Sequence, residues 1–285
     1  MTEKSIHRRK DDALVTLFGR RKVVIGVIHA PPLPGSPEYQ GAETATLYER
    51  AVEEGRRYAE GGVDGIIVEN HGDIPFLKPD EIGPETAAVM AVMAHEVRRT
   101  VPVPVGINVL ANGAVTALAV AKAAGAGFVR VNQWTNAYVA NEGIVEGPAA
   151  RATRYRAWLH ARPVRIFADV HVKHGAHAIV ADRGLAELTR DAEFFDADVL
   201  IATGQRTGDA AALDEIRAIR QAASLPVIVG SGADKDNIGD LLAVADGVIV
   251  ASSLKQDGVW WNPVDPDRVH AFMAAADAVR SDGGR

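Results

Sequence analysis

The chain has no cysteine, no long hydrophobic run and no apolar leader at its start. Because none of its 285 residues is cysteine, disulfides, thiolate nucleophiles and cysteine-based metal sites are excluded. Its apolar runs are too short to span a bilayer, and the opening MTEKSIHRRKDD lacks the apolar core of a signal peptide. We therefore expect a cytoplasmic protein with no membrane insertion.

The chain also lacks an excess of positive charge. It carries 31 basic and 37 acidic residues, for a net charge of −6 at pH 7. This balance gives no electrostatic reason to expect nucleic acid as the principal partner. Hydrophobic residues make up 47%, which is enough for a sizeable core. No linker composition is evident, so we expect one domain over residues 1–285, with residues 1–22 as an N-terminal extension.

Eight short apolar runs, each followed by a helix-like stretch, organise the chain. They begin at Val23, Gly65, Val103, Phe128, Val164, Asp198, Pro226 and Gly247. Eight such units predict a single (β/α)8 TIM barrel of the phosphate-binding type, over about residues 23–280. Residues 11–19 predict a short helix at the bottom of the barrel, ended by Gly19.

Two further segments stand next to predicted strand ends. Residues 31–37 contain four prolines and cannot be helical, so we expect either a stiff connector or a wall of the site. Residues 134–147 predict an irregular loop that is long enough to be functional.

Glycine and serine residues follow the last two predicted strands. They are Gly230, Ser231, Gly232, Ser252 and Ser253. In TIM barrels these two loops often bind a phosphate, because glycine lets backbone N–H groups approach an anion closely. We therefore predict a small phosphorylated ligand at this rim, where Lys255 adds a positive charge. Glycines that only form tight turns are the alternative.

The fifth predicted strand is the most polar of the eight. Alternation places Asp169, His171 and Lys173 on one face, while the residues between them are apolar. We predict His171 as the proton-transfer group, because its ordinary pKa lies nearest neutrality. Asp169 orients it or acts as a base, and Lys173 stabilises an oxyanion or forms a Schiff base. A purely structural network is the alternative.

The other strand ends supply further polar side chains. Glu69 is predicted to be a base, a metal ligand or a hydroxyl-binding group. Ligand contacts are predicted for His29, Asn70, Asn108, Arg130, Asn132 and Thr203. For Arg130, an ion pair that balances Glu69 and Asp169 deep in the barrel is the alternative. Because residues 69 and 70 have opposite parity, only one of the two should point inward.

No cofactor and no metal ligand is assigned on this pattern. A divalent ion surrounded by His29, Glu69, Asp169 and His171 remains an alternative. His171, His174 and His177 also recur at three-residue spacing. They straddle a predicted strand end and a glycine-containing loop, so this spacing does not make them one helical face.

Three blocks of the sequence resemble one protein family. They are VIHAPPLPGSP from Val27, DGIIVEN from Asp64 followed by Asp73 and Pro75, and ADVHVKH from Ala168. On these blocks the chain resembles the BtpA/SgcQ family, with similarity from about Val23 to Ser253. The resemblance implies a TIM-type barrel in the phosphate-binding group. One branch of that family is named for photosystem I accumulation in cyanobacteria, and another belongs to a sugar-related gene cluster.

We expect an enzyme that acts on a small phosphorylated, sugar-like or nucleoside-like ligand. The reaction would be of the lyase, isomerase or glycosyl-bond type, with acid–base chemistry at the barrel mouth. A non-catalytic assembly or stabilising factor is the first alternative, with Trp134, Tyr138, Trp260 and Trp261 as an exposed partner surface. A metal-dependent hydrolase is the second. We also expect a homo-oligomer.

Overall fold

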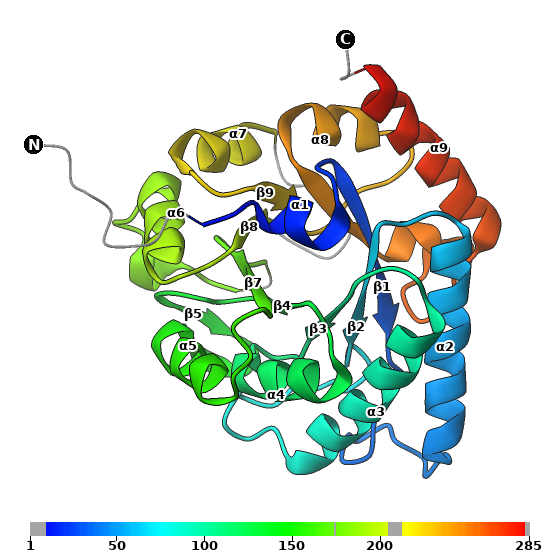
Figure 1. Ribbon diagram of the computed structural model, residues 1–285. Coiled ribbons are helices and arrows are strands. Elements are labelled where there is room, and N and C mark those ends of the chain that lie inside the picture. Colours follow the sequence, from blue (N-terminus) through cyan, green and yellow to red (C-terminus); the bar gives the residue numbers. More distant parts are fainter. Residues whose placement is uncertain (1–9, 174, 205–212, 283–285) are drawn as a thin grey trace, which may run out of the picture.

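Eight parallel strands close into a barrel in the computed structural model, which describes residues 10–173, 175–204 and 213–282 (Figure 1). The barrel order is β1-β10-β9-β8-β7-β4-β3-β2, and β1 closes it by pairing with β10. The strands are β1 (Val23–His29), β2 (Gly65–Glu69), β3 (Val105–Asn108), β4 (Phe128–Val131), β7 (Arg165–Asp169), β8 (Val199–Ala202), β9 (Val227–Val229) and β10 (Gly247–Val250). The predicted parallel eight-stranded barrel is confirmed.

Helices surround the barrel and separate its strands along the chain (Figure 1). They are α1 (Ala13–Phe18), α2 (Thr44–Glu60), α3 (Pro84–Thr100), α4 (Ala114–Ala124), α5 (Ala149–Trp158), α6 (Leu185–Phe194), α7 (Leu213–Ala222), α8 (Ile238–Val244) and α9 (Pro266–Asp282). Single 3-10 turns add η1 (Ala178–Val180), η2 (Ser252–Leu254) and η3 (Gln256–Gly258). Among the described residues, none of the helices combines the length and the apolar character that crossing a membrane requires.

The core has two layers because barrel strands bury both of their faces. The inner layer contains residues such as Ile25, Phe128 and Phe167, and the outer layer packs the strands against the helices. Helix α1 belongs to the inner layer, since its Leu14 is fully buried there. Figure 1 shows α1 lying across the barrel. As predicted, this helix covers the bottom and ends at Gly19, which has a φ of 72°.

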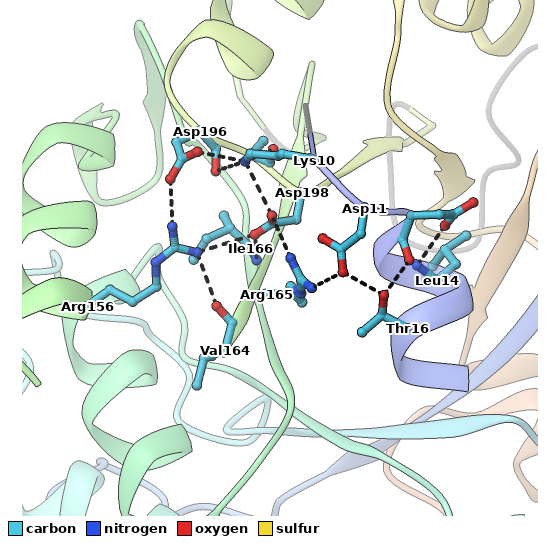
Figure 2. A network of polar contacts seen from close by, with 12 residues as sticks. Lys10, Asp11, Leu14, Thr16, Arg156, Val164, Arg165, Ile166, Asp196 and Asp198 are labelled. Carbon is cyan, nitrogen blue, oxygen red and sulfur yellow. Dashed lines mark hydrogen bonds and ion pairs between the residues drawn. The ribbon is translucent and has the colours of Figure 1, made fainter. Parts of the chain in front are cut away.

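Aspartates at the bottom of the barrel join neighbouring strands. Asp64, Asp198 and Asp246 precede β2, β8 and β10, and each accepts a hydrogen bond from an N–H of the adjacent strand or its start. Figure 2 shows Asp198 within a network in which Arg156 contacts both Asp198 and Asp196. The buried carboxylates of Asp198 and Asp246 are therefore paired with cations and with backbone donors, as burial of charge requires.

The segment predicted as an irregular loop contains a β-hairpin instead. Strands β5 (Ala137–Ala140) and β6 (Gly143–Glu146) pair antiparallel, with Ala137 opposite Glu146 and Ala140 opposite Gly143. Gly143 has a φ of 97°, which glycine adopts without strain as the chain turns back. The hairpin is short and carries little alternation, which is why periodicity does not reveal it.

The fifth predicted strand is shorter than its alternation suggests. It corresponds to β7, which ends at Asp169, and among the described residues its last backbone hydrogen bond to β8 runs from the N–H of Val170 to the carbonyl of Ile201 at 3.0 Å. The chain then bends through residues 171–173. Parity therefore does not extend from Asp169 to His171 and Lys173, and the prediction that all three share one inward face is wrong.

Candidate functional site

A cavity of about 450 Å³ opens where the barrel strands end. This volume suits a small ligand. One side presents charged and amide side chains from β1, β2, β4 and the segment after β7: His29, Glu69, His71, Arg130, Asn132 and Lys173. The predicted phosphate rim also lines the cavity, with Gly230, Ser231, Gly232, Ser252 and Ser253. The β5–β6 hairpin and residues 74–76 add walls.

Glu69 is at the centre of the polar side. Its Oε1 lies 2.9 Å from Nδ1 of His71 and 3.7 Å from Nε2 of His29. Its Oε2 accepts a hydrogen bond of 2.5 Å from the amide of Asn108. The imidazoles of His29 and His71 are stacked, with centroids 4.4 Å apart, and the edge of Trp260 packs on both. The carboxylate is thus held by His71 at Oε1 and by Asn108 at Oε2.

Electrostatics favour a charged Glu69 beside a neutral His29. Burial by itself raises the pKa of Glu69, but the hydrogen bond with His71 and the nearby positive charges bring that pKa well below its usual range. Burial lowers the pKa of His29 to about 3, against the opposing effect of Glu69. His29 Nδ1 lies 3.1 Å from the backbone carbonyl of Trp260. A carbonyl only accepts, so this nitrogen carries the proton and Nε2 presents a lone pair.

A tight turn after β2 positions His71. The next residue, Gly72, lies so close to the backbone of Pro31 and Pro32 that an added Cβ would come within 2.6 Å of it. Asp73 accepts a hydrogen bond of 2.8 Å from the N–H of Leu33. The proline-rich segment does not line the cavity; it supports the turn that carries His71, which corresponds to the predicted stiff connector.

Two asparagines predicted as ligand contacts hold the site from behind. Asn70 is buried, accepts from the N–H of Leu110 at 2.7 Å and donates to the carbonyl of Leu110 at 3.2 Å. Asn108 donates to Glu69, and its own buried Oδ1 has no partner among the described residues. Neither side chain lines the cavity, so the structure corrects both expected contacts. The opposite parity of residues 69 and 70 holds, because Glu69 is the one that faces inward.

Arg130 and Asp169 form a buried, bidentate ion pair. Nε and Nη2 of Arg130 lie 3.1 and 2.9 Å from the two oxygens of Asp169. Burial lowers the pKa of Arg130, but the Asp169 carboxylate raises it overall. Gly230 lies next to this pair: a Cβ there would lie 3.1 Å from Nη2 of Arg130 and within 2.7 Å of Ile201 and Thr203. Asp169 therefore positions Arg130, which lines the cavity, as the structural alternative for Arg130 predicts.

The rim consists of backbone and small side chains that fix one another. Ser253 Oγ donates to the carbonyl of Ala233 at 2.7 Å, and the amide of Asn237 donates to the carbonyl of Gly232 at 2.8 Å. The backbone N–H groups of Gly232, Ala233 and Ser252 have no acceptor within the described part of the chain. This is the arrangement that suits an anion.

Lys255 does not belong to this rim. It is fully buried, and its ammonium contacts the carboxylate of Glu54 on α2. The prediction that Lys255 adds a positive charge at the phosphate rim is therefore wrong. Its long side chain starts between η2 and η3 and extends into the interior instead.

His171 and Thr203 lie outside the cavity. Thr203 is buried and donates to the backbone carbonyl of His171 at 2.8 Å. His171 lines a separate hollow with His177 and Glu215, and its Nδ1 is 4.0 Å from Oε1 of Glu215. The prediction that His171 meets Glu69 and Asp169 in one cavity is wrong, because β7 has ended before residue 171. His174, of the predicted histidine repeat, lies outside the described residues.

The predicted aromatic partner surface is not a surface patch. Trp134 is fully buried and donates to the carbonyl of Phe195 at 3.0 Å. Tyr138 is buried and lines the cavity. Trp260 packs on the two imidazoles, and only Trp261 of the four is largely exposed, at 60%.

His71 is a site residue that the sequence predictions omit. It lies on the turn after β2, beyond the reach of strand alternation, so only its place next to the strand end could have pointed to it. In the part of the chain that the structure describes, His29, Glu69 and His71 are the only group of three clustered metal-ligating side chains, with ligand atoms within 4.8 Å of one another. The expected metal set that included Asp169 and His171 does not come together.

Comparisons with known proteins find relatives along most of the chain. A family model described as the BtpA family matches residues 20–278. The chain is 43% identical over 270 residues to the photosystem I biogenesis protein BtpA of Synechocystis, which covers 94% of this chain and 93% of that protein. It is 44% identical over 255 residues to a protein of Archaeoglobus fulgidus, which covers 90% and 98%.

Solved structures with a similar fold are more distant in sequence. N-(5'-phosphoribosyl)anthranilate isomerase from Pyrococcus furiosus superimposes with a TM-score of 0.56 at 15% identity, over 90% of this chain and 100% of that one. (S)-3-O-geranylgeranylglyceryl phosphate synthase from Thermoplasma acidophilum gives 0.56 at 14% identity, over 93% and 97%. At these identities the likeness is one of fold.

Proposed function

Because the chain belongs to the BtpA family and has a ligand-sized cavity at its barrel mouth, we propose that it is an enzyme acting on a small phosphorylated, sugar-like or nucleoside-like ligand. The observation that carries the proposal is the juxtaposition of two unlike walls in one cavity. The N–H groups of Gly232, Ala233 and Ser252 have no acceptor among the described residues, which suits a phosphate, and the polar side chains of the same cavity supply groups for proton transfer. The two similar barrels named above have phosphorylated compounds in their names, which fits this class of ligand.

The roles follow from the contacts of each group. His71 is the base, because it lines the cavity and Oε1 of Glu69 lies 2.9 Å from its Nδ1. Glu69 stays charged and orients the His71 ring, and Lys173 lines the same cavity as the group that neutralises an oxyanion. Asn132 also lines the cavity, and its Oδ1 has no partner among the described residues, so it accepts from a ligand hydroxyl. Asp169 is a positioning residue that acts through Arg130.

The phosphate half of the proposal is tested by binding. We expect ribose 5-phosphate and glycerol 3-phosphate to bind saturably in calorimetric titrations, while ribose and glycerol do not. Ser252→Asp places a carboxylate at the rim and should weaken binding at least tenfold, about 1.4 kcal/mol. The matched control is Ser281→Asp on the exposed side of α9, which should bind as the unaltered protein does.

Two results would contradict the phosphate assignment. One is equal binding of phosphorylated and unphosphorylated compounds. The other is full affinity in Ser252→Asp while its melting temperature shows an intact fold. Once a substrate is known, Glu69→Gln should retain binding and lose turnover, whereas Ser252→Asp should raise KM.

A second candidate function is that of an assembly or stabilising factor. It is favoured by one observation, the name of the Synechocystis relative at 43% identity. Affinity purification from cells that carry photosystem I distinguishes the two. Photosystem subunits recovered equally with the unaltered protein and with Glu69→Gln, in a protein that binds no phosphorylated compound, would favour the factor.

A further inference from the structure

Three side chains from the first two strands converge on one point of the cavity wall. His29 ends β1, Glu69 ends β2, and His71 follows on the turn. Residues 29 and 69 are register partners on adjacent strands, so the backbone itself brings their side chains together. One ligand atom from each of the three residues lies within 4.8 Å of the other two.

We propose that His29, Glu69 and His71 form a site for a divalent transition-metal ion such as Zn²⁺, with its open coordination position toward the cavity. The inference deepens the proposed function and rests on it for the identity of the cavity. With the ion bound, Glu69 and His71 are its ligands, and the acid–base roles given to them above apply to the metal-free protein. Two imidazoles and one carboxylate are the donor set of catalytic zinc sites that keep a position open for water or substrate. Mg²⁺ and Ca²⁺ prefer oxygen ligands alone, so the two imidazoles select against them.

The distances are close to those that a tetrahedral ion needs. Metal–ligand bonds of about 2.0–2.2 Å place neighbouring ligand atoms about 3.4 Å apart. Oε1 of Glu69 is already 2.9 Å from Nδ1 of His71 and 3.7 Å from Nε2 of His29. These two distances are close to the required separation, and the stacked rings of His29 and His71 must turn so that their lone pairs meet at the ion.

The orientation of His29 supports the same conclusion. Its Nδ1–H is directed to the carbonyl of Trp260, so Nε2 has only a lone pair to offer to the carboxylate of Glu69. Two acceptors that face each other in a buried place repel unless a cation lies between them. Histidines that bind a metal usually donate their other ring N–H to a carbonyl or carboxylate, as His29 does to Trp260.

The surroundings fix the remaining freedom of the three ligands. Asn108 donates to Oε2 of Glu69 and leaves Oε1 for the cluster. The edge of Trp260 lies 4.5 Å from the ring of His71 and 5.7 Å from the ring of His29, between centroids. The nearby Arg130 is paired with Asp169, so its charge is largely compensated. Within the cluster the Glu69 carboxylate therefore supplies a negative charge for a cation, while Lys173 lines the same cavity.

The test uses the full chain after dialysis against a chelator. Titration with Co²⁺ should give visible absorption bands of a four- or five-coordinate ion that saturate at one equivalent, and Zn²⁺ should displace them. Elemental analysis after removal of free metal should give the same stoichiometry. Glu69→Gln and His71→Ala should each weaken binding at least tenfold. Glu69→Gln is isosteric, so a retained melting temperature separates loss of binding from loss of fold.

The chain offers a matched control in its second pair of imidazoles. The rings of His171 and His177 lie 3.9 Å apart outside the cavity, and His177→Ala should leave binding unchanged. Binding below a tenth of an equivalent, unchanged affinity in Glu69→Gln and His71→Ala, or loss of binding in His177→Ala would each overturn the proposal.

The same metal-free samples are titrated with ribose 5-phosphate, so the two proposals fail separately. Phosphate binding without metal binding removes only the metal site. Metal binding that is lost in Glu69→Gln, in a protein that binds no phosphorylated compound, supports the metal site and removes the phosphate proposal.

Discussion

At the scale of single residues, the bottom of the barrel depends on carboxylates that each serve several donors. Asp246 shows this arrangement: it accepts from the N–H of Val227 at 3.0 Å and pairs with Arg220 and Arg21 at 2.5 and 3.2 Å. Burial raises the pKa of Asp246, but these hydrogen bonds and charges lower it overall. Its charged form is therefore part of the folded state.

This residue gives a pH-dependent prediction. A carboxyl whose pKa is lowered on folding stabilises fully above its unfolded pKa of about 3.9, and this stabilisation is lost as the pH falls through the folded pKa. We expect Asp246→Asn to reduce the free energy of unfolding by about 1–3 kcal/mol at pH 7. In urea unfolding the difference should stay constant from about pH 7 to pH 5 and shrink below about pH 4.

The control for this series is Asp277→Asn, whose carboxylate is largely exposed and pairs with Arg280 on the same helix. It should change stability by less than about 0.5 kcal/mol at any pH in the series. A difference for Asp246→Asn that persists undiminished at pH 3.5 would show that its charge does not stabilise the fold.

At the scale of elements, hydrogen bonds from polar side chains connect the loops at the barrel mouth to one another. Asn70 joins the loop after β2 to the loop after β3, and Asn112 joins the loop after β3 to the loop after β4. Thr203 and Ser253 do the same after β8 and β10. Each bond leads from a side chain to a neighbouring backbone, so the cavity walls hold their shape together.

These loop–loop hydrogen bonds explain which site residues the sequence predicts and which it does not. Alternation identifies Glu69 as inward and the run after β9 as rim, because both depend on strand periodicity and strand order. Alternation does not show that Asn70 and Thr203 bind a neighbouring loop rather than a ligand, because a backbone carbonyl and a ligand oxygen accept from the same donors. His171 is misplaced because the bend after Asp169 depends on tertiary contacts, and Lys255 because its partner Glu54 is distant in sequence.

Helix α1 supplies a prediction for an element that sequence periodicity identifies correctly. Leu14 is fully buried in the inner layer of the core, while Val15 on the same helix is 47% exposed. Leu14→Ala should therefore lower the free energy of unfolding by about 2–5 kcal/mol. Val15→Ala should change it by less than about 0.5 kcal/mol. Thermal and urea unfolding measure both, and similar losses would mean that α1 does not close the barrel.

At the scale of the whole molecule, the last part of the chain contacts the first part both in the barrel and in the outer layer of helices. Strand β10 pairs with β1 to close the barrel, and the segment after β10 reaches α2 in the outer layer. The second contact is the pair of Lys255 and Glu54, which are 201 residues apart in sequence and both buried. The ammonium also lies 5.8 Å from the ring centroid of Tyr58. Lys255, which follows the rim serines in the sequence, thus joins the segment after β10 to helix α2 near the start of the barrel.

A double-mutant cycle tests this role of Lys255. Lys255→Met leaves Glu54 as a buried charge without its ammonium partner, and should cost about 3–5 kcal/mol of stability. Glu54→Leu should cost a similar amount for the converse reason, while the double variant should lie within about 1–2 kcal/mol of the unaltered protein, because apolar groups replace both charges. Urea unfolding supplies the four free energies.

The double variant should bind ribose 5-phosphate with unchanged affinity, since neither side chain lines the cavity. A small stability cost for Lys255→Met together with a tenfold loss of phosphate affinity would instead return Lys255 to the rim.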